Sequence, residues 1–229
     1  MIEKKSEEEI RKYQEIFEKD RKVIVSNVFQ NEEIEKLHRF LHRLLPQYWN
    51  CTTCIKKDKM DLSMVDKRNT LRIQMAQNAF ANGDFSFYFY RTFNAIPNQY
   101  SSVEYEIRNY MSSSTFIEYL NSITKLTLTK LNTLFVSKYT SNCFLSTHSD
   151  HGNGKIAFVI HISKDWKPQY GGHLHFLNNE RTKIIETFCP EYNSLMIFEI
   201  PPENGIPHFV GHVAPNVPIP RIAITGWYE

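Results

Sequence analysis

The chain has 229 residues, enough for one large domain or for a domain with an extension, and either can bury a substantial core. Its 27 basic and 25 acidic side chains leave a net charge of +2, and the basic residues are scattered, so nothing indicates nucleic acid as a partner. The N-terminus is charged, and no window is long and apolar enough for a membrane span. We therefore expect a soluble, cytoplasmic protein without a signal peptide, a transmembrane segment or a membrane partner.

The first part of the chain contains patterns of both helices and strands. Ser6 is followed by three glutamates, which is typical of a helix N-terminus, and apolar residues at helical spacing come next. A β-branched run after this helix predicts a strand. We predict helices over 6–19, 31–46, 103–111 and 116–123, strands over 22–29 and 49–55, and a polar, charged connection over 58–68.

An aromatic stripe alternates with other residues over Phe85–Phe93, which predicts a strand. Such stripes usually belong to a core, although in an enzyme one face could line a substrate groove. The four cysteines, Cys51, Cys54, Cys143 and Cys189, are too few and too scattered for a disulfide framework. We expect them to be reduced, because one C-x-x-C pair is a weak signal for zinc or redox chemistry.

After Leu126 the sequence changes to short β-branched and aromatic runs separated by Gly, Asn and Pro. We predict five strands there, over 134–139, 156–162, 172–177, 195–200 and 221–228. This rhythm predicts a mainly β, α+β fold, a double-stranded β-helix (jelly roll) whose interior can hold a metal and a small cosubstrate. We place the domain boundary here: residues 1–125 form a helical and mixed region packed as a buttress on the barrel, and residues 126–229 form the jelly-roll core.

Two clusters of polar residues lie in this β-rich half. His148 and Asp150 would point to the same side of an extended strand, because side chains alternate with period two. A second cluster supplies His208 and His212. Two imidazoles and one carboxylate can hold one face of Fe(II) and leave the opposite face open, as non-haem oxygenases require. The third ligand is either His208 or His212, and we choose His208 because Pro207 and the preceding loop resemble a strand entry near the site.

Arg221 begins an apolar strand soon after the second cluster, where an unpaired charge would be costly to bury. A 2-oxo acid could take two open metal positions and O2 the third, and its far carboxylate needs a planar, permanently charged partner such as arginine. His161 and Tyr139 could reach the same carboxylate. For either one alone, a core residue with a satisfied polar tip is at least as common.

At these residues the sequence resembles the Fe(II)- and 2-oxoglutarate-dependent dioxygenases, in particular their prolyl 4-hydroxylase-like branch. The matching segments cover about the last 100 residues: 139–150, 154–176, 191–198 and 207–228. The resemblance implies that His148, Asp150 and His208 bind iron, and the family pattern H-x-V-x-x-V matches 208–213. It also implies 2-oxoglutarate held by Arg221, with O2 and ascorbate as further cofactors. The position of His161 is where relatives often have a tyrosine that assists this arginine.

The resemblance leaves the substrate open, because it does not extend through the N-terminal half. By analogy we expect hydroxylation of a C–H bond, first of a prolyl or other residue in a peptide or protein, and second of a free amino acid or small metabolite. A hypothesis of another class is a non-catalytic metal-binding protein with a jelly-roll fold. Fold similarity alone does not choose among these.

Overall fold

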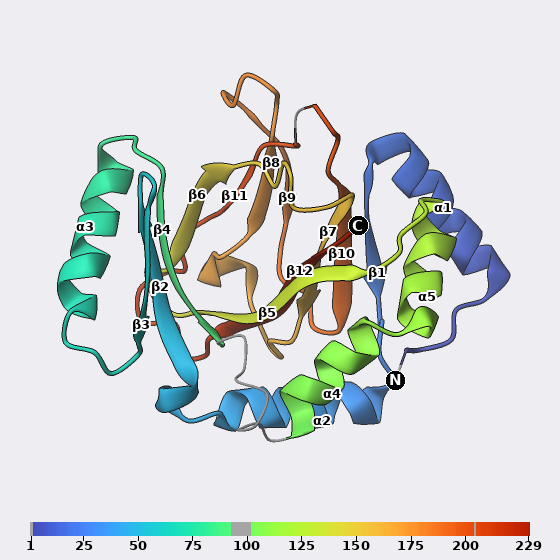
Figure 1. Ribbon diagram of the computed structural model, residues 1–229, viewed down its shortest axis with the longest axis horizontal. Helices are drawn as coiled ribbons and strands as arrows, with labels where there is room; N and C mark the ends of the chain where they lie inside the picture. The colour runs from blue at the N-terminus through green and yellow to red at the C-terminus, as the bar shows by residue number, and fades with distance from the viewer. Residues whose placement is uncertain (1, 93–101, 204) are drawn as a thin grey trace.

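A computed structural model describes residues 2–92, 102–203 and 205–229. Within them, twelve strands form one strongly curled sheet, and the helices lie outside it (Figure 1). The helices are α1 (Glu7–Asp20), α2 (Asn31–Arg43), α3 (Asn69–Ala81), α4 (Ser102–Met111) and α5 (Ser114–Thr124). The strands are β1 (Lys22–Ser26), β2 (Trp49–Ile55), β3 (Asp58–Ser63), β4 (Ser86–Thr92), β5 (Leu131–Tyr139), β6 (Phe144–His148), β7 (Ile156–His161), β8 (Leu174–Leu177), β9 (Ile184–Phe188), β10 (Ser194–Glu199), β11 (His208–Val210) and β12 (Arg221–Tyr228).

The curl of the sheet comes from two groups of strands that are joined through β4. One group has the order β1-β10-β7-β12-β5, and the other has the order β6-β11-β8-β9. Strand β4 pairs with both β5 and β6, and it also pairs with β2, which continues into β3. All of these pairs are antiparallel. The mainly β, jelly-roll fold predicted from the sequence is confirmed, and its two groups of strands enclose the interior.

Strand β7, in the middle of the first group, is buried on both faces, which explains its continuous apolar run. On β7, Ile156, Phe158 and Ile160 belong to the core beneath the helices, whereas Ala157 and Val159 belong to the core of the barrel interior. All six residues of β7 are buried. A strand buried on one face only would instead alternate apolar and polar residues.

Helices α1, α2 and α5 cover the outer face of this first group. Phe17 of α1, Leu37 of α2 and Phe116 of α5 lie in one buried cluster with apolar residues of β5, β7, β10 and β12. Strand β1, between α1 and α2, pairs with β10 and so enters the same sheet. The N-terminal part therefore supplies both helices and strands to this architecture, and the domain boundary near residue 126 stays a prediction.

Several elements differ from the sequence-based expectations. Residues 58–63 form β3 rather than an irregular connection, because they pair along their whole length with β2. Helix α3 and strand β9 were not predicted, and β6 and β11 were not among the five strands predicted after residue 126. Phe93, the last residue of the predicted aromatic strand, lies outside the described residues.

The four cysteines are free thiols, as predicted. Burial raises the pKa of the Cys51 thiol to about 12 and that of Cys143 to about 11, which keeps both protonated at neutral pH. In the described ranges no helix is both long and apolar enough to cross a lipid bilayer.

Candidate metal and cosubstrate site

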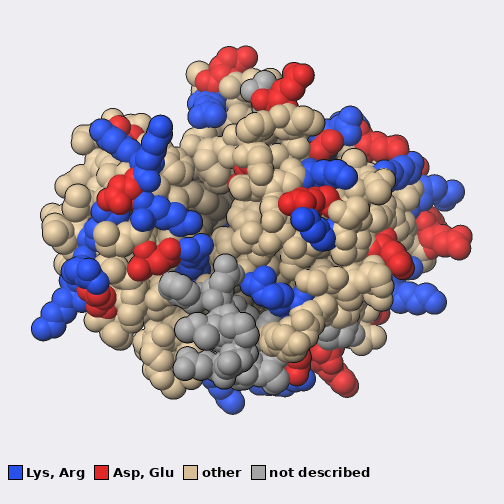
Figure 2. Space-filling view, in the orientation of Figure 1, with Lys and Arg blue, Asp and Glu red and all other residues tan. Residues whose placement is uncertain are grey.

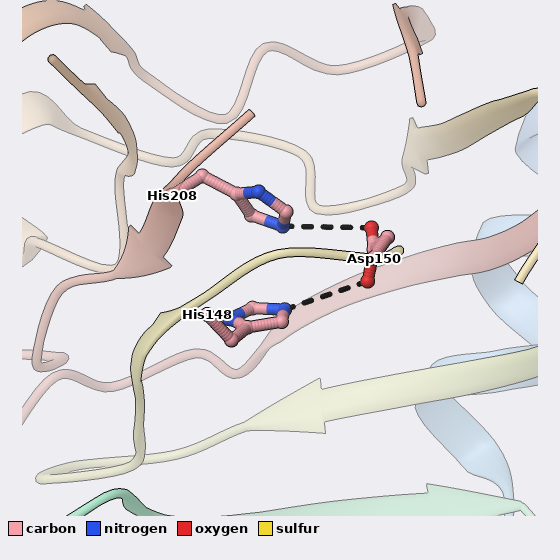
Figure 3. A group of neighbouring side chains, drawn as sticks. All are labelled: His148, Asp150 and His208. Atoms are coloured by element: carbon pink, nitrogen blue, oxygen red, sulfur yellow. Dashed lines mark ion pairs between the residues drawn. The ribbon is translucent and has the colours of Figure 1, made fainter. Parts of the chain in front are cut away.

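Three side chains, His148, Asp150 and His208, converge on one point inside the barrel (Figure 3). His148 Nε2 lies 3.6 Å from Asp150 Oδ1, and His208 Nε2 lies 3.5 Å from Asp150 Oδ2. One ligand atom from each residue lies within 4.8 Å of the others. Two imidazole nitrogens and a carboxylate oxygen at these separations can bind one metal ion on a single side.

The strands of the second group bring these residues together. His148 is the last residue of β6, His208 is the first residue of β11, and the two are cross-strand partners with ring centroids 4.3 Å apart. Asp150 follows in the turn after β6, not within an extended strand as the sequence argument assumed. The turn nevertheless directs its carboxylate toward both imidazoles.

Backbone carbonyl groups orient the two imidazoles. His148 Nδ1 lies 3.0 Å from the Ser146 carbonyl oxygen, and His208 Nδ1 lies 2.8 Å from that of Ile206. If each Nδ1–H donates to its carbonyl, the Nε2 lone pair of each ring faces Asp150. This arrangement fixes the tautomer that metal-binding histidines use.

Burial sets the protonation of the cluster. His208 is 4% exposed, and its burial together with the nearby His148 lowers its pKa to about 4. Burial alone would raise the pKa of the Asp150 carboxyl, but His148 and His208 lower it below its usual value. The cluster therefore holds a neutral imidazole and an ionised carboxylate at neutral pH, which are the forms that ligate metals.

His212, the alternative third ligand, lies in a different environment. Its ring stacks on Phe144 with centroids 4.5 Å apart, and Phe80 of α3 meets it edge-on at 4.6 Å. It does not belong to the group of converging ligand atoms. Of the two histidines in the second cluster, the fold brings His208 to the site and places His212 in an aromatic contact with α3.

Beside the cluster is a pocket with an empty volume of about 950 Å³, part of it open to solvent. Arg221 and Tyr139 line it together with His148, Asp150 and His208. Arg221 is 3% exposed, its Nε has no hydrogen-bond partner among the described residues, and none of their carboxylates pairs with it. Its guanidinium carbon lies 4.9 Å from the centre of the Tyr139 ring. A buried cation without an anion is costly, so this site suits an anionic ligand.

His161 is buried on the inner side of β7, opposite Ala223 of β12. Its Nδ1 has no hydrogen-bond partner among the described residues, and burial, with the nearby Arg221 charge, holds its pKa well below the usual value. His161 is not among the residues that line the pocket. Its role beside Arg221 stays a prediction.

The pocket also contains residues that the sequence did not single out. The aromatic stripe of β4 lines it, as one of the two alternatives for that stripe anticipated. Trp227, Lys59 and Arg91 line it as well. Trp227 could have been found by period-two alternation from Arg221 along β12, and Arg91 by the same alternation from Phe89 along β4, whereas Lys59 carries no such signal.

Comparison with known proteins bears on this site. Residues 134–229 match the sequence model of the 2OG-Fe(II) oxygenase superfamily. The chain is 27% identical over 119 residues to the prolyl 3-hydroxylase OGFOD1 of Xenopus laevis, an alignment that covers 50% of this chain. The chain spans only 23% of the length of that relative.

Solved structures share the fold at low sequence identity. A 2OG-Fe(II) oxygenase family oxidoreductase from Burkholderia pseudomallei has a TM-score of 0.64 at 12% identity, with 100% of this chain and 93% of the other covered. A prolyl-4-hydroxylase from Pseudomonas putida has a TM-score of 0.56 at 13% identity, with 96% and 98% covered. The epimerase SnoN of nogalamycin biosynthesis has 0.58 at 10% identity, with 96% and 82% covered. These likenesses concern the fold alone.

Proposed function

We propose that this protein is a 2-oxoglutarate-dependent dioxygenase that hydroxylates a C–H bond, in a prolyl or other residue of a peptide or protein, because residues 134–229 match the sequence model of the 2OG-Fe(II) oxygenase superfamily. The observation that carries the proposal is the convergence of His148, Asp150 and His208 at the wall of a pocket that also contains a buried, unpaired arginine. In the overall reaction, 2-oxoglutarate and O2 would convert the C–H group to C–OH and leave succinate and CO2.

The donor set fits Fe(II). Two imidazoles and one carboxylate on one side of an ion form the facial arrangement that suits non-haem Fe(II), and such an arrangement leaves the other positions open. His148, Asp150 and His208 would hold the ion. Iron bound there would supply the activation of O2, while the pocket excludes bulk water and holds the C–H bond in place.

The unpaired guanidinium fits 2-oxoglutarate. Arg221 would bind the C5 carboxylate with two parallel N–H donors, which neutralises its buried charge. Tyr139, against whose ring the guanidinium lies, would restrict the arginine to this orientation and could donate its hydroxyl to the same carboxylate. Arg221 thus would orient the cosubstrate without taking part in bond breaking.

Two observations support a prolyl substrate. The relative in Xenopus laevis is described as a prolyl 3-hydroxylase. In addition, Phe85, Phe87 and Phe89 line the pocket beside the metal cluster, and the Phe85 and His148 ring centroids are 6.3 Å apart. A pyrrolidine ring is apolar and rigid, so it can pack on aromatic faces with little loss of conformational entropy.

Succinate formation tests the proposal. The purified protein with Fe(II), O2 and 2-oxoglutarate should form succinate, and His148→Ala should form none above background. A product 16 Da heavier in proline-containing peptides, dependent on 2-oxoglutarate, would identify a peptidyl substrate, and the same shift only in free proline would identify a small-molecule hydroxylase. Metal binding without succinate would favour a non-catalytic protein. A requirement for ascorbate, a cytoplasmic location and the absence of a nucleic-acid partner stay predictions from the sequence.

A further inference from the structure

We infer that Lys59, at the mouth of the pocket, forms an anion subsite that binds a carboxylate of the peptide substrate close to the residue that is hydroxylated. The inference rests on the proposed function, because it places the ligand beside the same metal cluster. It adds a substrate class, an acidic peptide, and a specificity-determining residue. Three features support it: the geometry of the pocket wall, the pairing of Asp58 and Asp61 with other side chains, and the charge of the lining residues.

Strands β3, β2 and β4 form a wall of the pocket. In their register Lys59 is opposite Cys54, and Cys54 is opposite Phe87. Residues in one row across a sheet point to the same face, and two strand spacings separate Lys59 from Phe87 by about 10 Å. Both side chains line the pocket. A substrate could therefore contact Lys59 and the aromatic stripe at once.

This wall leads directly to the metal cluster. The rings of Phe87 and Phe85 are 5.8 Å apart, and the rings of Phe85 and His148 are 6.3 Å apart. An extended peptide spans roughly 3.3 Å per residue, so the distance from the cluster to Lys59 corresponds to a few residues. The carboxylate that Lys59 binds would thus belong to a near neighbour of the hydroxylated residue.

The carboxylates around Lys59 already have partners. Arg91 donates two hydrogen bonds to Asp61, of 3.0 and 2.6 Å, and Thr52 donates a third. Asp58, on the same strand as Lys59, pairs with Arg72 of α3 at 2.6 Å. Lys59 has no ion pair or side-chain hydrogen bond among the described residues. Its ammonium group is therefore available to an incoming ligand.

The charge of the pocket favours an anion. Its described lining residues include three basic side chains, Lys59, Arg91 and Arg221, but a single carboxylate, Asp150. Partial burial, and then the positive charge of Arg91, lower the pKa of Lys59. Asp61 neutralises Arg91, and a bound dication with 2-oxoglutarate would balance Asp150 and Arg221, so the charge of Lys59 stays uncompensated.

Figure 2 shows a hollow between the side of the molecule formed by β2, β3 and α3 and the middle of the molecule, with side chains of both charges along that side. Lys57 provides a matched comparison, because it is an exposed lysine of the same hairpin that does not line the pocket. A general attraction of acidic peptides would involve both lysines, whereas a subsite involves Lys59 alone.

The test uses acetylated and amidated heptapeptides with a central proline, in which glutamate or glutamine occupies each of the other positions in turn. Binding is measured by calorimetry without oxygen, with Fe(II) and 2-oxoglutarate present, so that no turnover occurs. At one or two positions we expect the glutamate peptide to bind about 10-fold more tightly than its glutamine partner, as a charge-assisted contact would give. The Lys59→Gln variant should bind both peptides equally, whereas the control variant Lys57→Gln should keep the preference for glutamate. The Lys59→Glu variant should instead prefer a peptide with lysine at the same position.

Equal binding of both peptide series to wild-type protein, or a preference that survives Lys59→Gln, would overturn the inference. The result that refutes the proposed function is a separate one: wild-type protein would form no succinate at all. Wild-type protein that forms succinate but does not distinguish glutamate from glutamine would refute the subsite alone.

Discussion

Arg221 and Tyr139 are direct cross-strand partners on β12 and β5, and the guanidinium carbon lies 4.9 Å from the centre of the phenol ring. The pairing holds a buried cation in one orientation at the wall of the pocket, with no described carboxylate to neutralise it. This relationship connects the fold to the proposed binding of 2-oxoglutarate, because the strand register places the charge where only a ligand can satisfy it.

Arg221→Ala should weaken the use of 2-oxoglutarate much more than the binding of iron. We expect the KM for 2-oxoglutarate in succinate formation to rise by about 10- to 100-fold, the range for loss of a charge-assisted bidentate contact. Iron affinity should change little, because Arg221 does not belong to the converging ligand group. Arg68→Ala, which removes an exposed arginine paired with Asp66, is the control. Equal losses in both affinities would indicate a purely structural arginine.

His212→Ala should keep the metal and lower stability. The substitution removes the ring that stacks on Phe144 and meets Phe80, and such aromatic contacts contribute about 0.5–1.5 kcal/mol beyond buried area. Iron affinity by titration and unfolding by urea separate the two effects. Loss of iron from His212→Ala, with retention in His208→Ala, would reassign the third ligand.

Acid should destabilise the fold through His161. Its folded pKa is held well below 6.5, so the folded state favours the neutral ring and the unfolded chain binds a proton first. The stability that this neutral ring contributes is present above pH 6.5 and is lost as pH falls from there toward the folded pKa. The urea midpoint of the His161→Gln variant should therefore fall less between pH 7 and pH 5 than the urea midpoint of wild type. His151→Gln, at an exposed site, should follow wild type; identical slopes for all three would exclude His161 as the cause.

Phe116→Ala should destabilise the whole molecule. Phe116 of α5 is fully buried, and its ring stacks on Tyr228 of β12 with centroids 6.3 Å apart. Truncation of a buried phenylalanine costs about 3–5 kcal/mol. If the N-terminal helices buttress the barrel, Phe116→Ala should still unfold in urea in one cooperative transition, at a lower midpoint than wild type. Tyr105→Ala, at a residue 64% exposed, should have little effect, and two separate transitions would show that the helical part folds independently.

Much of the fold could be predicted because its strands and helices carry strong local patterns. Strand β7 is an almost continuous apolar run, β12 is rich in β-branched and aromatic residues, and α1 begins with the capping box at Ser6 that the sequence indicates. Burial on one or both faces leaves such patterns in the sequence, so they are readable without coordinates.

The missed elements lack these patterns. Helix α3 buries only small or polar residues, including Ala76 and Arg72, while Leu71 is 62% exposed. Strand β9 is an edge strand on which Ile184 and Ile185 are both exposed, so its side chains do not alternate in burial. Strand β3 is charged, and its hairpin turns through Lys56 at a φ of 58°, without the Gly or Asn that usually marks such a turn. Contacts with neighbouring elements, rather than local sequence patterns, determine where these three elements form.

The site was only partly predictable for a related reason. His148, Asp150, His208 and Arg221 follow spacings that chemistry constrains, so sequence reasoning found them. Arg91 continues the alternating row of Phe85, Phe87 and Phe89, whereas Lys59 reaches the pocket only because β3 pairs with β2 and β2 pairs with β4. The place of Lys59 therefore depends on tertiary pairing, which no local motif records.

Metal titration of single-site variants tests the central claim most directly. Wild-type protein should bind one Fe(II), or one Co(II) as a spectroscopic probe, per chain, and bound metal should raise the unfolding midpoint. His148→Ala, Asp150→Ala and His208→Ala should each lose this binding at metal concentrations that saturate wild type, while His212→Ala retains it. Undiminished stoichiometry and affinity in any of the three variants would contradict the assignment of that residue as a ligand, and retention in all three would refute the site.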